Sequence, residues 1–227
     1  MVEHNFKTDV FLIFYSVVFR KNRIDCIFFG TLFYFCETNI NERKYIAMSN
    51  TIKIHDKTFT RTIAHQEIAG EVKRVAEQIN KDYAGKNPLL LAVLNGSFMF
   101  VAELMKHLDL GCEVSFVKLS SYQGTNSTGV IREVIGLSES ITGRDVIIVE
   151  DIVDTGYTMQ NMLETLGTRE PNSIAIASLF VKPARLQVPV DVKYSVFTIP
   201  DRFIVGFGLD YDGLGRNLPD IYDVVEE

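Results

Sequence analysis

The chain has 227 residues with a formal net charge of −6 at pH 7, and 47% of its residues are hydrophobic. This length and composition suffice for one folded domain with a substantial core. The negative charge argues against nucleic acid or an anionic membrane as a bulk partner, so anionic substrates would need local groups and a metal.

The first 47 residues differ in composition from the rest and hold half of the 16 phenylalanines. Two apolar runs, Val10–Phe19 and Cys26–Phe35, are about ten residues long, whereas a membrane-spanning helix needs about 20. The basic residues follow the first run, the reverse of a signal peptide. A membrane-associated hairpin is one alternative. We expect instead an upstream extension from a misplaced start, with Met48 as the true initiator.

The predicted domain therefore covers residues 48–227. Of the three cysteines, only Cys112 lies in this domain, and their spacing resembles no metal site. A reduced, cytoplasmic location is expected on this basis, with no membrane association of the domain.

Within this domain, apolar runs and periodic patterns alternate along the chain. Helices are predicted at His65–Tyr83 and Phe98–Leu108, and after Gly156, where Met159, Met162, Leu163 and Leu166 recur at helical spacing. The predicted strands are a short strand and turn in Thr51–Arg61, then Leu89–Leu94, the alternating Glu113–Leu119, and Val146–Val149, Ser173–Val181 and Tyr194–Phe197. Strands without a polar alternation are typical of a parallel sheet buried on both faces. The fold class is thus α/β.

The most informative stretch runs from Val146 to Thr158. Four β-branched residues are followed by Glu150 and Asp151, then by Asp154, Thr155, Gly156, Tyr157 and Thr158, before the helical pattern begins. We read this as a strand, an acidic loop and a helix. Ligands of open α/β sheets bind at the carboxyl ends of strands, and a helix N-terminus binds phosphate. A ligand with both hydroxyls and a phosphate would suit carboxylates beside an anion site.

Two plainer interpretations compete with this one. Asp154 or Thr155 could simply cap the helix, which would explain one or two polar residues but not three carboxylates in five positions. The Asp-Thr-Gly triplet also occurs in aspartic proteases, but those proteins are all-β and a helical pattern follows here.

The stretch closely resembles the phosphoribosyl-diphosphate (PRPP) motif of type I phosphoribosyltransferases, and in particular the hypoxanthine (hypoxanthine-guanine) phosphoribosyltransferase family, over roughly Ile52–Val225. The resemblance implies a twisted, mostly parallel sheet flanked by helices, with a small hood from the N- and C-terminal segments. It also implies Asp154 as the catalytic proton acceptor and Mg²⁺ as cofactor, linked to Glu150, Asp151 and Asp210.

The resemblance also implies functions for further residues. The implied PRPP- and nucleotide-binding residues are Glu150, Asp151, Asp154, Thr155, Gly156, Tyr157, Thr158, Leu94, Asn95, Gly96 and Arg216. The implied purine-binding residues are Lys182, Phe203, Ile204 and Asp210. The closing loop would include Ser121 and Tyr122, and Val130–Gly136 resembles the strand that returns from it. The peptide after Leu94 is often cis in the family. Asn95 and Tyr157 replace lysines found in many relatives, so phosphate binding should rely more on backbone amides.

The expected function is the transfer of phosphoribose from PRPP to hypoxanthine or guanine in purine salvage, by a homo-oligomer (dimer or tetramer). Two alternatives stay open: a PRPP-binding regulator on the same fold, which the negative charge disfavours, and a transferase for xanthine or another base.

Overall fold

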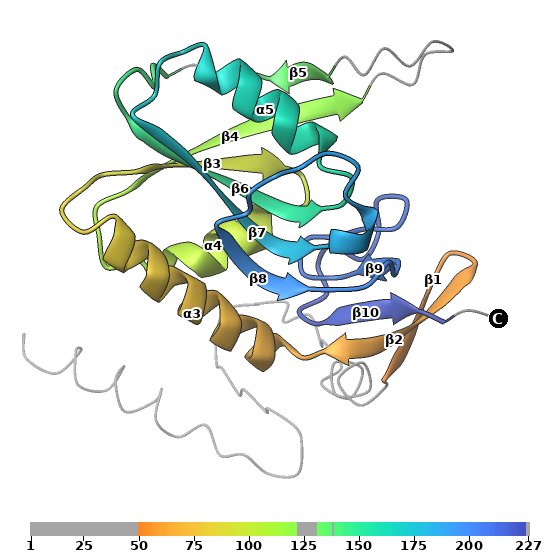
Figure 1. Cartoon of the computed structure of the whole chain (residues 1–227). Coiled ribbons are helices and arrows are strands. Elements are labelled where there is room, and N and C mark those ends of the chain that lie inside the picture. Colours follow the sequence, from red (N-terminus) through yellow and green to blue (C-terminus); the bar gives the residue numbers. More distant parts are fainter. Residues whose placement is uncertain (1–49, 122–130, 138, 226–227) are drawn as a thin grey trace, which may run out of the picture. The chain divides into compact units, whose positions relative to one another are not determined.

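The computed structural model describes residues 50–121, 131–137 and 139–225, and the helices and strands of these ranges lie in one compact unit that begins at Thr51 (Figure 1). The strands of its larger sheet are β3 (Leu89–Leu94), β4 (Glu113–Ser121), β5 (Ile131–Ile135), β6 (Asp145–Val153), β7 (Ser173–Val181) and β8 (Tyr194–Thr198). Their order is β5-β4-β3-β6-β7-β8. Five of these strands, β4, β3, β6, β7 and β8, are parallel, and β5 alone pairs antiparallel, with β4.

Helices cover both faces of this sheet. Helix α5 (Tyr157–Gly167) packs on one face, and helices α3 (His65–Asp82) and α4 (Phe98–Met105) pack on the other (Figure 1). The central strands β3 and β6 are therefore buried on both sides, which explains their unbroken apolar runs. The predicted apolar stripe of α3 is fully buried, as its helical spacing requires; it comprises Ile68, Val72, Val75, Ala76 and Ile79.

A second, smaller sheet joins segments that are far apart in the sequence. It is antiparallel, in the order β1-β2-β10-β9, and its strands are β1 (Thr51–Ile54), β2 (Lys57–Ile63), β9 (Ile204–Val205) and β10 (Ile221–Val224). It lies near the carboxyl ends of β6, β7 and β8 (Figure 1). The predicted fold class, including the hood from both terminal segments, is confirmed.

Several predicted boundaries were wrong. Thr51–Arg61 is not one short strand and turn but most of a hairpin, since β1 and β2 pair along their length. Helix α4 stops at Met105 rather than Leu108, because the next amides bond to carbonyls three residues earlier, as in a 3₁₀ turn. Strand β6 continues past the expected Val149 as far as Val153. None of the described helices combines the length and apolarity needed to cross a bilayer.

Candidate active site

The site is built around the end of β6, where the structure corrects the expected acidic loop. Glu150 and Asp151 belong to the strand itself, which stays paired with β7 through Ile152 and Val153. Both of these residues are β-branched, and Val153 is buried, so burial extends the strand beyond the two carboxylates. The carboxylates are thereby held on a rigid element rather than on a loop.

The two carboxyl groups are costly to keep ionised. The Glu150 side chain is only 8% exposed, and its Oε2 has no hydrogen-bond partner among the described residues. Burial, reinforced by the neighbouring Asp151, raises the pKa of Glu150 well above its usual value. Burial also raises the pKa of Asp151, although its carboxylate accepts a 2.9 Å hydrogen bond from the Ile152 amide and feels the positive charge of Arg216. Such a pair suits a ligand that brings hydrogen-bond donors or a cation.

The loop between β3 and α4 lies directly against these carboxylates. The peptide bond between Leu94 and Asn95 is cis. A Cβ atom at Gly96 would collide with the Asp151 carboxylate, and one at Gly208 would collide with the Gly96 carbonyl oxygen. Only glycines permit this approach, so the backbones of the predicted pyrophosphate loop and of the segment after β9 meet beside Asp151.

The loop from Asp154 to Gly156 leads into α5 without a capping side chain. Gly156 occupies the N-cap position with a left-handed φ of 89°, and no side chain bonds to the first-turn amides. The interpretation of Asp154 or Thr155 as a plain helix cap is therefore wrong. Because the first turn of a helix lacks internal acceptors for its N–H groups, these amides can bind an external anion. The first turn also carries no acidic residue, and Tyr157 is 47% exposed.

Asp154 instead has a partner that the sequence did not reveal. The Arg185 Nε donates to Asp154 Oδ1 at 3.1 Å. Arg185 lies in the short 3₁₀ helix Pro183–Arg185 that follows β7. No periodicity or motif in the sequence pairs these two residues.

Lys182 lies beside the same loop. Its side chain is buried, its Nζ donates to Asp201 Oδ1 at 3.3 Å, and its backbone N–H donates to the Val153 carbonyl at 3.0 Å. The predicted purine-reading lysine and the predicted proton acceptor thus follow the ends of adjacent strands, β7 and β6.

Phe203 lies just before strand β9 of the smaller sheet, and Ile204 is the first residue of that strand. The Phe203 ring is 44% exposed and packs edge-on against Tyr211, with ring centroids 5.6 Å apart. Its ring centroid also lies 6.2 Å from that of Phe59, and stacking of Phe203 on a base stays a prediction. Ile204 is buried in β9 and pairs with Asp223 of β10, which fixes the backbone at that point.

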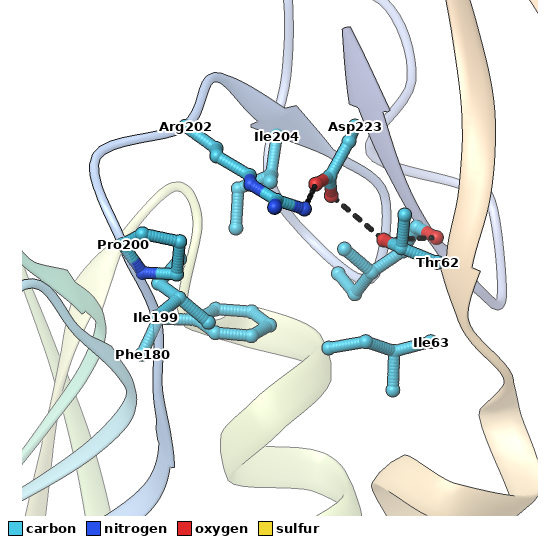
Figure 2. A pocket seen from close by; sticks show the side chains of 9 residues that line it. Thr62, Ile63, Phe180, Ile199, Pro200, Arg202, Ile204 and Asp223 are labelled. Atoms are coloured by element: carbon cyan, nitrogen blue, oxygen red, sulfur yellow. Dashed lines mark hydrogen bonds and ion pairs between the residues drawn. The ribbon is translucent and has the colours of Figure 1, made fainter.

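A cavity of about 120 Å³ lies beside this segment, between the two sheets (Figure 2). Arg202 and Asp223 form an ion pair of 2.9 Å at its edge, and Asp223 also accepts a 2.7 Å hydrogen bond from Thr62. The residues that line it are Thr62, Ile63, Phe180, Ile199, Pro200, Arg202, Ile204, Ile221 and Asp223. None of the carboxylates of β6 is among them, so this cavity lies beside the predicted purine-binding segment and is separate from the candidate reaction centre.

Asp210 and Arg216 are paired with each other. The Arg216 guanidinium contacts Asp210 Oδ1 at 2.6 Å and donates to the Gly208 carbonyl at 2.7 Å, while Asp210 Oδ2 accepts from the Gly213 amide. Within the described residues, no three His, Cys, Asp or Glu side chains form a ready metal cluster. The predicted trio of Glu150, Asp151 and Asp210 is therefore not assembled as a closed metal site.

Only the start of the predicted closing loop falls within the described residues. Ser121 is the last residue of β4, while Tyr122 lies outside the described residues, so this prediction stays a prediction.

Comparison with known proteins agrees with the geometry. Residues 61–212 match the model of the phosphoribosyl transferase domain family. The hypoxanthine-guanine phosphoribosyltransferase of Streptococcus pneumoniae is 46% identical, with 73% of this chain and 92% of that protein covered. The corresponding protein of Streptococcus mutans is also 46% identical, over 69% of this chain and 87% of its own length.

Solved structures resemble the chain as well. A crystal structure of a hypoxanthine-guanine phosphoribosyltransferase from Bacillus anthracis has a TM-score of 0.69 and 36% identity, covering 73% of this chain and 96% of its own. A hypoxanthine phosphoribosyltransferase from Staphylococcus aureus has a TM-score of 0.71 and 35% identity, covering 83% and 97%. With the conserved architecture and this level of identity, the chain belongs to the hypoxanthine-guanine phosphoribosyltransferase family, enzymes of purine salvage.

Proposed function

We propose that the protein joins hypoxanthine or guanine to PRPP and releases the nucleoside 5′-monophosphate and pyrophosphate. One observation carries the proposal. The uncapped N-terminus of α5, the buried carboxylates of β6 and the β3–α4 loop, which approaches them at Gly96, occupy one end of the parallel sheet. An anion site beside carboxylates that can accept hydrogen bonds from hydroxyls suits a ribose phosphate.

The phosphate and ribose contacts follow from this arrangement. The amides and hydroxyls from Asp154 to Thr158 bind the 5′-phosphate, with the α5 dipole favouring its negative charge. The carboxylates of Glu150 and Asp151 accept hydrogen bonds from the ribose hydroxyls. Leu94, Asn95 and Gly96 offer their backbone to the pyrophosphate, and Arg216 contacts its oxygens after leaving Asp210.

The donor set also fits Mg²⁺. The unpartnered Oε2 of Glu150 is a buried oxygen that a cation would satisfy. Mg²⁺ sites commonly combine one or two carboxylates with substrate phosphates and water, which agrees with the lack of a closed cluster in the described residues. When bound, the ion would neutralise the charge that develops on the leaving pyrophosphate.

The purine would be held by groups on the other side of the ribose. Lys182 donates to the 6-oxo oxygen, Phe203 stacks on the ring, and the backbone at Ile204 reads the base edge, with Asp210 nearby. The reaction is a displacement at C1′ of PRPP by N9 of the base. Asp154 accepts or shares the proton at purine N7, which makes N9 the better nucleophile.

Asp154→Asn tests the site. We expect nucleotide formation to slow by roughly 10²-fold or more, the usual contribution of a positioned proton acceptor. PRPP affinity should remain, because the phosphate contacts come mainly from amides. The rate is measured in single turnovers, and PRPP affinity by equilibrium titration. Equal losses of rate and affinity would assign Asp154 to the structure of the loop.

We also expect a homo-oligomer, a dimer or tetramer. Val114 and Phe116 project from the same face of β4 and are 38% and 39% exposed, which supports burial against another copy. Light scattering of the purified protein gives the mass directly.

A further inference from the structure

We propose that Arg185 is a positioning residue for the reaction: it fixes the Asp154 carboxylate in the orientation that accepts the purine proton. This inference rests on the proposed function of Asp154. Arg185 follows Lys182 by three positions and lies outside the motif that suggested the family.

The first observation is the ion pair itself. Arg185 Nε lies 3.1 Å from Asp154 Oδ1, and both side chains are partly exposed, at 45% and 38%. A partly exposed aspartate without a partner samples several staggered rotamers. The hydrogen bond to Oδ1 selects one of them and leaves Oδ2 to face the base. An arginine does this well because its guanidinium stays charged and has a fixed planar geometry.

The second observation concerns the backbone that carries Arg185. The connection after β7 is bonded to the loop around Asp154 on both sides of Arg185: the Lys182 amide donates to the Val153 carbonyl at 3.0 Å, and the Gln187 amide donates to the Thr155 carbonyl at 3.0 Å. The guanidinium is thus anchored on a segment that cannot shift independently of Asp154. Positioning groups need this kind of support, because misplacements of about 1 Å cost large factors in rate.

The third observation is the second partner of Arg185. Its Nη1 lies 3.6 Å from Asp201 Oδ2, and the other oxygen of Asp201 lies 3.3 Å from Lys182 Nζ. Positive and negative groups therefore alternate from Lys182 through Asp201 and Arg185 to Asp154. This chain of contacts joins the proposed purine-reading lysine to the proposed proton acceptor, so the two groups that face the base are held relative to each other.

The ion pair is too exposed to contribute much to folding, because water screens exposed pairs strongly. Positioning and folding can therefore be separated by experiment. Arg185→Gln should fold normally and melt at the wild-type temperature. Arg144→Gln is a matched control, because Arg144 also bridges to a carboxylate, that of Glu113, but lies before β6 at the opposite end of the strand.

The test measures two quantities for each variant: the single-turnover rate at saturating PRPP and base, and the KM of each substrate. Arg185→Gln should lower the rate about tenfold and change each KM by less than about threefold, the pattern of an interaction that acts in the transition state. Arg185→Lys keeps a charge at this position and should recover most of the rate. Arg144→Gln should match the wild type.

The double variant Asp154→Asn with Arg185→Gln separates the two claims. If Arg185 acts through Asp154, the double variant should be no slower than Asp154→Asn alone, about 10² below wild type rather than 10³. A wild-type rate in Arg185→Gln, or losses that multiply, would overturn the positioning role while leaving the proposed function intact. A wild-type rate in Asp154→Asn would overturn both.

Discussion

Buried acids define the site at the scale of single residues. Glu150 is held at the end of a strand with one oxygen unpartnered among the described residues, an arrangement that opposes folding unless a ligand satisfies it. Functional sites commonly retain groups of this kind, which cost stability in the free protein and contribute binding energy in the complex.

This cost predicts a pH-dependent effect of Glu150→Gln. Because burial raises the pKa of Glu150 in the folded state above its ordinary 4.5, ionisation is more costly in the folded than in the unfolded chain. The stability of the protonated form is fully present below pH 4.5 and is lost as the pH rises through the folded pKa. At pH 8 the ligand-free variant should melt at a higher temperature than the wild type. The expected difference is roughly 2–4 °C for each kcal/mol of ionisation cost that the substitution removes.

Calorimetry at pH 8 and near pH 4.5 measures this difference, which should shrink at the lower pH. Glu77→Gln, on the exposed side of α3, is the control and should leave the melting temperature unchanged at both. A less stable Glu150→Gln protein at pH 8 would show that the carboxylate is satisfied in the free protein.

Among the structural elements, the loop between β6 and α5 matters most for the proposed phosphate site. Gly156 gives the chain a left-handed residue at the start of the helix, and a Cβ atom at this position would lie only 3.0 Å from atoms of Val188 and Val190. The loop therefore depends on both a backbone conformation and the packing of the connection after β7.

Gly156→Ala should consequently lower stability more than Gly143→Ala. Gly143 also has a positive φ, of 69°, but a Cβ there meets nothing within 4 Å. Both substitutions incur about 1–2 kcal/mol for the left-handed conformation, and only Gly156→Ala adds steric contact. Urea unfolding measures the stabilities, and the KM for PRPP should rise in Gly156→Ala alone. Equal effects of the two substitutions on stability and KM would contradict this account of the loop.

The elements also show what sequence can predict. Leu89–Leu94 and Ser173–Val181 were predicted to the residue, because continuous apolar runs between turn residues mark buried strands clearly. The end of β6 was misplaced because acidic side chains resemble a loop, while pairing with β7 holds them in the strand. Arg185 was missed because its bond to Asp154 joins residues 31 positions apart, and local patterns carry no information about such contacts.

At the scale of the whole molecule, two sheets divide the work. The carboxyl end of the parallel sheet carries the residues proposed to bind phosphate and ribose, and the smaller sheet carries the segment proposed to bind the purine. The ion pair of Arg202 with Asp223 and the hydrogen bond of Asp223 with Thr62 tie that segment to β10 and β2 (Figure 2). The described site residues fall between Leu94 and Arg216, and the family match covers residues 61–212.

We therefore propose that residues 1–47 are dispensable for activity. A protein that begins at Met48 should fold cooperatively and match the kcat and KM values of the full chain within about twofold, because every proposed contact lies beyond the removed segment. Thermal melting and steady-state kinetics compare the two proteins. An inactive or unfolded shorter protein would place part of the domain before Met48.

Product formation from a panel of free bases is the direct test of the proposed transfer reaction. The purified protein is given PRPP and Mg²⁺ with hypoxanthine, guanine, xanthine or adenine, and nucleoside monophosphate and pyrophosphate are quantified together. We predict equal amounts of both products with hypoxanthine or guanine, little with adenine, and no turnover in EDTA until Mg²⁺ is restored. Failure to form a nucleotide from either hypoxanthine or guanine, or full activity in the chelator, would contradict the account.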